Sequence, residues 1–378
     1  MLQVVIHKQI DSLFEIMPEW EELKSGFHDI TAFQDISWLK SCLKYESKQK
    51  DINPYIIEVR DQNQTIGIIP LHLVQETYAR IPFRILKPIG TRVSDYLIPV
   101  LSKDYCPQKI LSIAMKEIYK DKASWDCINW GSVPENSIFD SVLNMNIMKD
   151  FSSVERNKTY LCPFLILDKD IEKVDNSISK KFLKGVRYYE RKLNREGVLK
   201  YTKVVSENEI EPVMNKLFEL HCEKWGETDT PSAYRFEEER MFVLTAAKSL
   251  FERNLLHLSY LSHNDEIAAV EFGMADGVRR YLYLGTYNIK FRKYPIAHIL
   301  LYKLIIEACN EGYEIMDFMR GNEPYKQRVA TNLNHIIEYV FYNNSAKSLL
   351  FRSINHANTN KYFHLFMEKI SNHSNQLR

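Results

Sequence analysis

A short segment from Asp317 to Lys326 carries an aspartate, an arginine, a glutamate, a tyrosine and a lysine around one glycine. It follows an apolar run, so we expect a loop at the end of a strand, where functional residues often lie. A lysine or arginine there can bind an anionic substrate or stabilise an oxyanion, and a tyrosine can protonate a leaving group. The candidates are Tyr325 and Lys326 for catalysis and Asp317, Arg320 and Glu323 for substrate binding. The alternative is a salt-bridged turn.

Glu271 is a single carboxylate in the otherwise apolar run Ala268 to Gly273. Burying a carboxylate is costly unless it is paired or useful. Burial would also raise its pKa toward that of a general base. Glu271 is therefore the candidate base, and the alternative is a glutamate on the solvent face of an alternating strand.

Two further groups of side chains have spacing that suits binding. Arg292 and Lys293 come just before a helix that Pro295 opens, and a helix N-terminus favours anions. His221 and Trp225 are one helical turn apart and share a face, which either lines an acceptor cleft or packs against the protein. The candidate cofactor-binding residues are Arg292, Lys293, Ile296 and Ala297. The alternative for this loop is an ordinary helix start with exposed basic residues.

The predicted helix 180–195 carries a basic stripe at three- and four-residue spacing, formed by Lys180, Lys184, Arg187, Arg191 and Arg195. Such a stripe suits an anionic partner, for example a lipid head group, a polysaccharide, an acyl carrier protein or tRNA. The alternative is a solvated helix face. No nucleic-acid recognition motif accompanies the stripe, so we expect no DNA partner.

Alternating helix and strand patterns predict an α/β fold in two similar halves. The second half reads as a basic helix, a strand, two helices over 209–225 and 235–253, a three-strand meander over 257–287, a helix over 295–311, and strands at 315–318 and 336–342. We expect an N-terminal domain over 1–153, a connecting segment over 154–177, a C-terminal domain over 178–344 and a helical tail over 345–378.

Composition excludes several classes of protein. The 378 residues have a net charge of +1, so no global charge attracts nucleic acid or membrane. The six cysteines lack Cys-x-x-Cys spacing and the motifs of metal sites are missing, so we expect no metal and a cytoplasmic location. No segment is apolar and long enough to span a membrane, and the N-terminus has no signal-peptide pattern.

Four segments of the second half resemble the CelD-like acyltransferases, a branch of the GNAT superfamily, and more distantly the Fem-type peptidyltransferases. They are the basic helix 180–197, the helix 217–225, the run 284–295 and the loop 317–326. In the first half, Gly67–Leu71 and Val93–Tyr96 match weakly. The resemblance implies two tandem GNAT-like domains with mixed, mostly antiparallel strands flanked by helices. It also implies that Glu271 lies on the central strand that often carries the base, and that residues 292–297 bind the CoA pyrophosphate, although Pro295 stands where the family usually has glycine.

The sequence therefore predicts an acyltransferase that moves an acyl group, acetyl first among the candidates, from acyl-CoA to an amine or hydroxyl. The acceptor would be a sugar or related metabolite, and the resemblance implies a place in surface polysaccharide biosynthesis. No serine or cysteine has a nucleophile setting, so we expect direct attack without a covalent intermediate. Two alternatives remain open: a Fem-like transferase that uses aminoacyl-tRNA, and a catalytically inactive scaffold.

Overall fold

The computed structural model describes residues 2–9, 11–16, 26–47, 53–145, 151–226 and 231–357. The first half contains strands β1 (Leu2–His7), β2 (Asn53–Asp61), β3 (Gln64–Tyr78), β4 (Ile81–Pro88), β5 (Val100–Leu101) and β6 (Cys127–Pro134). Its helices are η2 (Ala32–Gln34), α2 (Ile36–Ser47), α3 (Pro107–Lys120) and α4 (Ile138–Asn144).

The second half begins with β7 (Ser153–Ile166), α5 (Ile171–Ser177), α6 (Lys180–Glu196) and β8 (Leu199–Lys203). Helices α7 (Glu207–Trp225), η3 (Ala233–Arg235) and α8 (Glu237–Glu252) follow. The meander is β9 (Leu256–His263), β10 (Glu266–Ala275) and β11 (Arg279–Tyr287). The chain continues through η4 (Ile289–Phe291), α9 (Ile296–Glu311), β12 (Ile315–Asp317), η5 (Lys326–Arg328) and β13 (Asn332–Tyr342).

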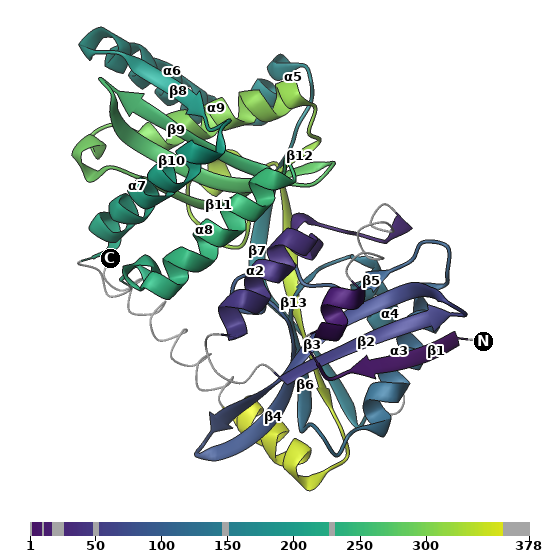
Figure 1. Cartoon of the computed structure of the whole chain (residues 1–378). Coiled ribbons are helices and arrows are strands. Elements are labelled where there is room, and N and C mark those ends of the chain that lie inside the picture. Colours follow the sequence, from purple (N-terminus) through teal and green to yellow (C-terminus); the bar gives the residue numbers. More distant parts are fainter. Residues whose placement is uncertain are drawn as a thin grey trace, which may run out of the picture.

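One continuous sheet runs through both halves, in the order β1-β2-β3-β4-β6-β13-β7-β12-β11-β10-β9-β8, with β5 paired to β3. Its neighbours are antiparallel except for β4–β6 and β11–β12. The long strands β7 and β13 form the middle and join the two lobes (Figure 1). Strand β13, from the end of the second half, pairs with β6 of the first half on one side and with β7 on the other.

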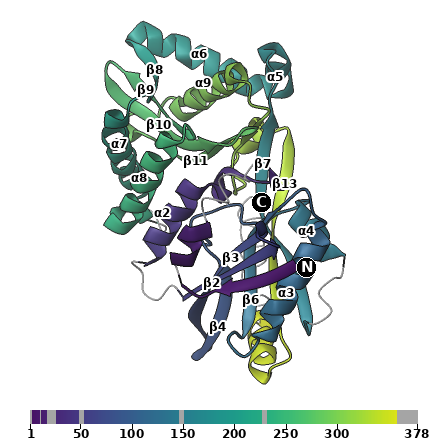
Figure 2. The same cartoon turned by 45° about the vertical axis from the view of Figure 1, so that its right-hand side comes forward.

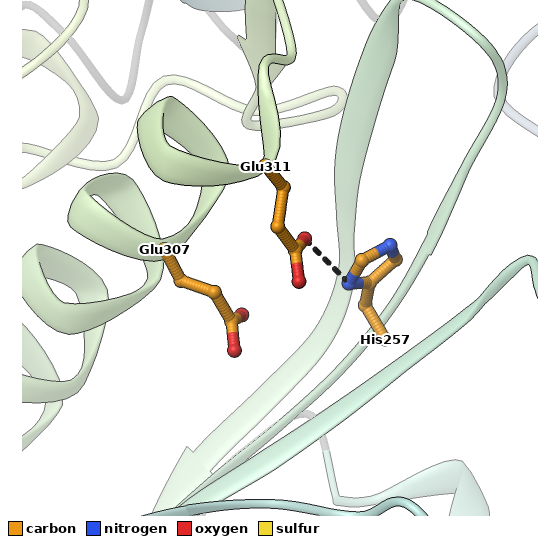
Figure 3. A group of neighbouring side chains, drawn as sticks. All are labelled: His257, Glu307 and Glu311. Atoms are coloured by element: carbon orange, nitrogen blue, oxygen red, sulfur yellow. Dashed lines mark ion pairs between the residues drawn. The ribbon is translucent and has the colours of Figure 1, made fainter. Parts of the chain in front are cut away.

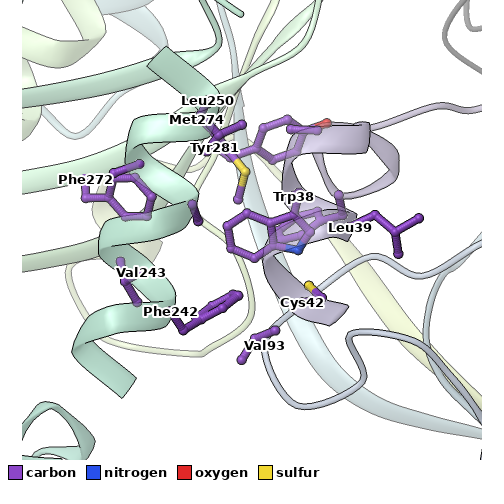
Figure 4. Packing of buried hydrophobic residues seen from close by; sticks show 14 of the residues in the cluster. Trp38, Leu39, Cys42, Val93, Phe242, Val243, Leu250, Phe272, Met274 and Tyr281 are labelled. Atoms are coloured by element: carbon purple, nitrogen blue, oxygen red, sulfur yellow. The ribbon is translucent and has the colours of Figure 1, made fainter. Parts of the chain in front are cut away.

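Helices cover both faces of the sheet in each lobe, as the rotated view also shows (Figure 2). In the second half, α6 and α9 pack on one face around Ala268, Ile299 and Met316. Helices α7 and α8 pack on the other face, where α2 of the first half joins them. Figure 4 shows this shared core, in which Trp38 and Cys42 of α2 meet Phe242, Phe272 and Tyr281. The two halves are thus one packed body.

The predicted α/β class with mixed, mostly antiparallel strands and flanking helices is confirmed. The structure adds that the predicted connecting segment 154–177 contains most of β7 and all of α5, and that the halves share one sheet. The predicted domain limits stay predictions. Residues 17–25 of the predicted N-terminal domain and residues 358–378 of the predicted tail lie outside the described residues, whereas 346–357 are helical.

Candidate active site

Glu271 lies in the middle of β10, directly opposite Gly285 of β11. Its carboxylate occupies the space that a side chain at position 285 would fill, since a Cβ built there would lie 1.9 Å from Glu271 Oε2. Glycine inside a strand often marks such a close approach. Residues 268–270 and 272–275 are buried and Glu271 itself is only partly exposed, so this strand does not alternate between a core face and a solvent face.

Burial raises the pKa of Glu271 to about 8, against the opposing effect of Arg280 and Lys326. A carboxyl group with this pKa exchanges its proton near neutral pH, which is the property of a general base. The prediction from one carboxylate in an apolar strand therefore agrees with the electrostatics of the site.

Strands β11 and β12 separate beside this carboxylate. Their parallel pairing covers only Arg279–Tyr281 against Ile315–Asp317, and β11 then continues to Tyr287 paired with β10 alone. The chain after Asp317 turns into the segment 318–328, which returns Tyr325 and Lys326 toward Glu271. Burial raises the pKa of Tyr325, and the nearby carboxylates of Glu271 and Glu323 raise it further, so the phenol keeps its proton.

Lys326 is 3% exposed, and its ammonium group is held by the loop that precedes it. Its Nζ donates to the carbonyl oxygens of Arg320 at 2.9 Å and Met319 at 3.3 Å. The third partner is Glu323 Oε2 at 2.9 Å, on a side chain that is half exposed. A buried ammonium with one exchangeable partner is suited to receive a developing negative charge.

Asp317 and Arg320 contact the first half of the chain. Tyr96 O–H donates to Asp317 Oδ2 at 2.8 Å, and Asp95 Oδ1 lies 2.7 Å from Arg320 Nε. Burial raises the pKa of Asp317 to about 6. The predicted substrate-binding group Asp317, Arg320 and Glu323 therefore lies together with Lys326, and Asp95 and Tyr96 of the first half contact it.

An aromatic group lies beside Tyr325. The ring centroids of Tyr325 and His298, in the first turn of α9, are 6.3 Å apart. The ring centroids of His298 and Phe182, in the first turn of α6, are 5.4 Å apart. The starts of α6 and α9 therefore meet at the segment that carries Tyr325 and Lys326.

The predicted anion loop precedes α9, as expected. Pro295 is the N-cap and has no side-chain capping bond, and the backbone N–H groups of Ile296 and Ala297 have no acceptor among the described residues. The side chains of Arg292 and Lys293 are exposed and, within the same part of the chain, make no hydrogen bond or ion pair. Free N–H groups, two cations and the positive end of a sixteen-residue helix suit a phosphate group.

His221 and Trp225 share a face of α7, with ring centroids 6.1 Å apart. His221 Nδ1 is bonded to Ser232 Oγ at 2.9 Å, and burial lowers the pKa of His221 to about 4. Between them, Lys224 lies 4.5 Å from the Tyr287 ring at the end of β11. Within the described residues, this group makes no hydrogen bond, ion pair or ring contact with Asp317 or Lys326, so its part in acceptor binding stays a prediction.

The basic stripe of α6 is only partly free. Arg187 pairs with Asp175, whereas Lys180, Lys181, Lys184 and Arg195 have no acidic partner in the described ranges. Lys180, Lys184, Arg187 and Arg191 line a surface recess of about 520 Å³ together with Glu172 and Asp175.

His257, Glu307 and Glu311 form the one group of potential metal ligands within the described residues (Figure 3). Arg280 pairs with Glu307, Lys203 pairs with Glu311, and His257 Nε2 is bonded to Tyr313. Two cations already balance the two carboxylates, so this group is an ion-pair network between β8, β9, β11 and α9.

Sequence reasoning missed Gly285, Asp95 and Tyr96 as parts of the site. The glycine within a strand was a signal for the first. The match of Val93–Tyr96 to the family pattern was a signal for the next two, but nothing in the sequence joined them to residues 317–320.

Residues 180–327 match the family model described as acetyltransferase (GNAT) domain. The matched range contains Glu271, the anion loop, Tyr325 and Lys326. The second half of the chain therefore carries a GNAT acetyltransferase domain.

Over the whole chain, the fold is similar to solved structures of low sequence identity. FemX has a TM-score of 0.61 at 12% identity, covering 93% of this chain and 99% of FemX. A conserved protein of unknown function from Bacteroides thetaiotaomicron has a TM-score of 0.58 at 12% identity, covering 90% and 100%. A tandem GNAT protein from the clavulanic acid biosynthesis pathway has a TM-score of 0.49 at 9% identity, covering 91% and 100%. No curated protein sequence matches the chain.

Proposed function

We propose that this protein transfers an acetyl group from acetyl-CoA to an amine or hydroxyl group of a sugar or related metabolite. The observation that carries the proposal is the buried Glu271 carboxylate, with a pKa of about 8, beside Lys326 and Tyr325 in a GNAT domain. The CelD-like resemblance supports a sugar acceptor and a place in surface polysaccharide biosynthesis. The unpaired cysteines suit the cytoplasm.

The residues support direct attack. Ionised Glu271 accepts the proton of the acceptor amine or hydroxyl as that atom attacks the thioester carbonyl carbon. Lys326 stabilises the oxyanion, which takes the place of the exposed Glu323 carboxylate on Nζ. When the carbon–sulfur bond breaks, Tyr325 donates its proton to the thiolate. The raised pKa of Tyr325 keeps that proton available at neutral pH.

The start of α9 supports CoA as the donor. The N–H groups of Ile296 and Ala297 and the side chains of Arg292 and Lys293 are free to bind the pyrophosphate. Pro295 lacks an N–H group, but it precedes the two free donors and leaves them available.

The test is calorimetric titration with acetyl-CoA, followed by thiol-release assays with amino-sugar acceptors. Arg292→Gln with Lys293→Gln is expected to weaken acetyl-CoA binding about tenfold, since two contacts to anionic oxygens are lost. Lys109→Gln with Lys116→Gln removes two exposed cations from α3 and is the matched control. Absence of heat with acetyl-CoA and longer acyl-CoAs would reject CoA as the donor. If no other donor is bound either, the inactive scaffold is the better interpretation.

A second candidate, a Fem-like transferase that uses aminoacyl-tRNA, is favoured by one observation. The free cations Lys180, Lys181 and Lys184 lie at the start of α6, which reaches the candidate site through Phe182. The likeness to FemX concerns the fold. Salt-sensitive tRNA binding that Lys180→Gln with Lys184→Gln weakens, without any acetyl-CoA binding, would favour this candidate and identify the anionic partner of α6.

A further inference from the structure

The loop 90–97 of the first half contacts the segment 317–320 through two adjacent residues. Asp95 binds Arg320 twice, by its Oδ1 to Nε at 2.7 Å and by its Oδ2, which accepts from the backbone N–H at 3.1 Å. Tyr96 O–H donates to Asp317 Oδ2, and Asp317 Oδ1 accepts the N–H of Met319 at 2.8 Å. The residues Asp95, Tyr96 and Asp317 are 5%, 3% and 2% exposed, so water competes little for these bonds.

These contacts fix the two carbonyl groups that hold Lys326. Met319 has a φ of +61°, a left-handed conformation that costs about 1 kcal/mol or more for a residue with a side chain. Such a conformation persists only where the surroundings enforce it, and Asp317 and Asp95 do so on either side. The carbonyl oxygens of Met319 and Arg320 then point to Lys326 Nζ.

The loop of the first half is itself held at three points. Tyr283 O–H donates to the Val93 carbonyl, the Trp38 indole N–H donates to Ser94 Oγ, and the Gln34 amide donates to the Tyr96 carbonyl, each at 2.8 Å. Because these three bonds hold the loop 90–97 in place, the loop can hold the segment 317–320 in a defined position.

We propose that Asp95 and Tyr96 are positioning residues of the first half, which set the place of the Lys326 ammonium through Asp317, Met319 and Arg320. The inference rests on the proposed role of Lys326 in acyl transfer. It assigns the N-terminal half a part in catalysis without direct contact with the reacting atoms.

The first arm of the test does not depend on catalysis. An amine-reactive acetylating reagent is applied to the intact protein, and modification of Lys326 is followed by peptide mass spectrometry. Lys326 is almost inaccessible, and we expect Asp95→Asn and Tyr96→Phe to increase its modification rate about tenfold by releasing the loop. Asp35→Asn is the control, because buried Asp35 and partly exposed Arg253 form an ion pair at 2.8 Å between the same two halves.

The second arm measures turnover. Asp95→Asn is expected to lower kcat about tenfold with the donor KM within about twofold, and to have no further effect in a Lys326→Ala background. The inference is overturned if Lys326 stays protected in both variants, or if Asp35→Asn lowers kcat and exposes Lys326 as much as Asp95→Asn does. If no donor is turned over at all, the proposed function fails, and the labelling arm still decides whether the two residues position Lys326.

Discussion

Replacing Glu271 with glutamine should change how the stability of the protein depends on pH. The pKa of this carboxyl group rises from 4.5 to about 8 on folding, chiefly because burial disfavours the charged form. The folded state therefore binds more protons than the unfolded chain between these values, and its stability falls as pH increases. At about 1.4 kcal/mol per pH unit, the loss between pH 4.5 and pH 8 is roughly 4–5 kcal/mol.

The assay is urea unfolding, followed by tryptophan fluorescence at several pH values from 5 to 9, with equal m-values as the check on two-state behaviour. The free energy of unfolding of the wild type minus that of Glu271→Gln should fall steadily with pH up to about pH 8 and then stay constant. Glu266→Gln is the control on the same strand, because Lys290 lowers the pKa of Glu266 and its titration lies below this range. Parallel curves for wild type and Glu271→Gln would refute the burial argument.

Two further predictions concern the same carboxylate. Gly285→Ala should lower activity at least tenfold with a stability change of about 1 kcal/mol, because the flexible carboxylate of Glu271 moves aside. The control is Gly185→Ala in α6, where an added Cβ meets nothing within 4 Å; it should leave activity unchanged and stabilise the helix by up to about 1 kcal/mol. Equal activity losses in the two variants would contradict a role for the close approach of Glu271 to Gly285. In pH–rate measurements, kcat/KM should rise with pH and level above about 8, as Glu271 becomes ionised, and Glu271→Gln should lose this step. A profile that is flat from pH 6 to 9 in the wild type would exclude Glu271 as the base.

The sequence predicted those features that depend on a local pattern of residues, such as the ends of a helix. The helix expected over 295–311 is α9 at 296–311, because Pro295 and Gly312 mark its ends, and Gly312 has a φ of +84°. Glu271 was singled out as the candidate base because one carboxylate interrupts an apolar strand, and its role as the base stays a prediction. The face that it occupies was not predictable, because the register between β10 and β11 shifts between Phe272 and Gly273.

Contacts between residues that are far apart in the chain could not be predicted from the sequence. Asp95 and Arg320 are 225 positions apart, and their pairing depends on the packing of α2 against α8 and on the shared sheet. Neither Asp95 nor Arg320 lies in a local sequence pattern that indicates this pairing. The sharing of one sheet was also missed, since β13 has the pattern of any buried strand and its two partners come from different parts of the chain.

The shared sheet leads to a last prediction, that the second half cannot fold alone when cut at residue 178. Within 178–344, β12 pairs with β11 and β13 has no partner, because β7 stands between β12 and β13. An eleven-residue strand with buried Ile336, Tyr339 and Phe341 would then be exposed on both edges and prone to aggregate.

The fragment 151–344 restores β7 and should be far more soluble, but it lacks Asp95 and Tyr96, so Lys326 should still react rapidly with the amine reagent. Solubility compared by gel filtration and circular dichroism decides the first point. A soluble, folded 178–344 fragment would mean that β13 finds another partner.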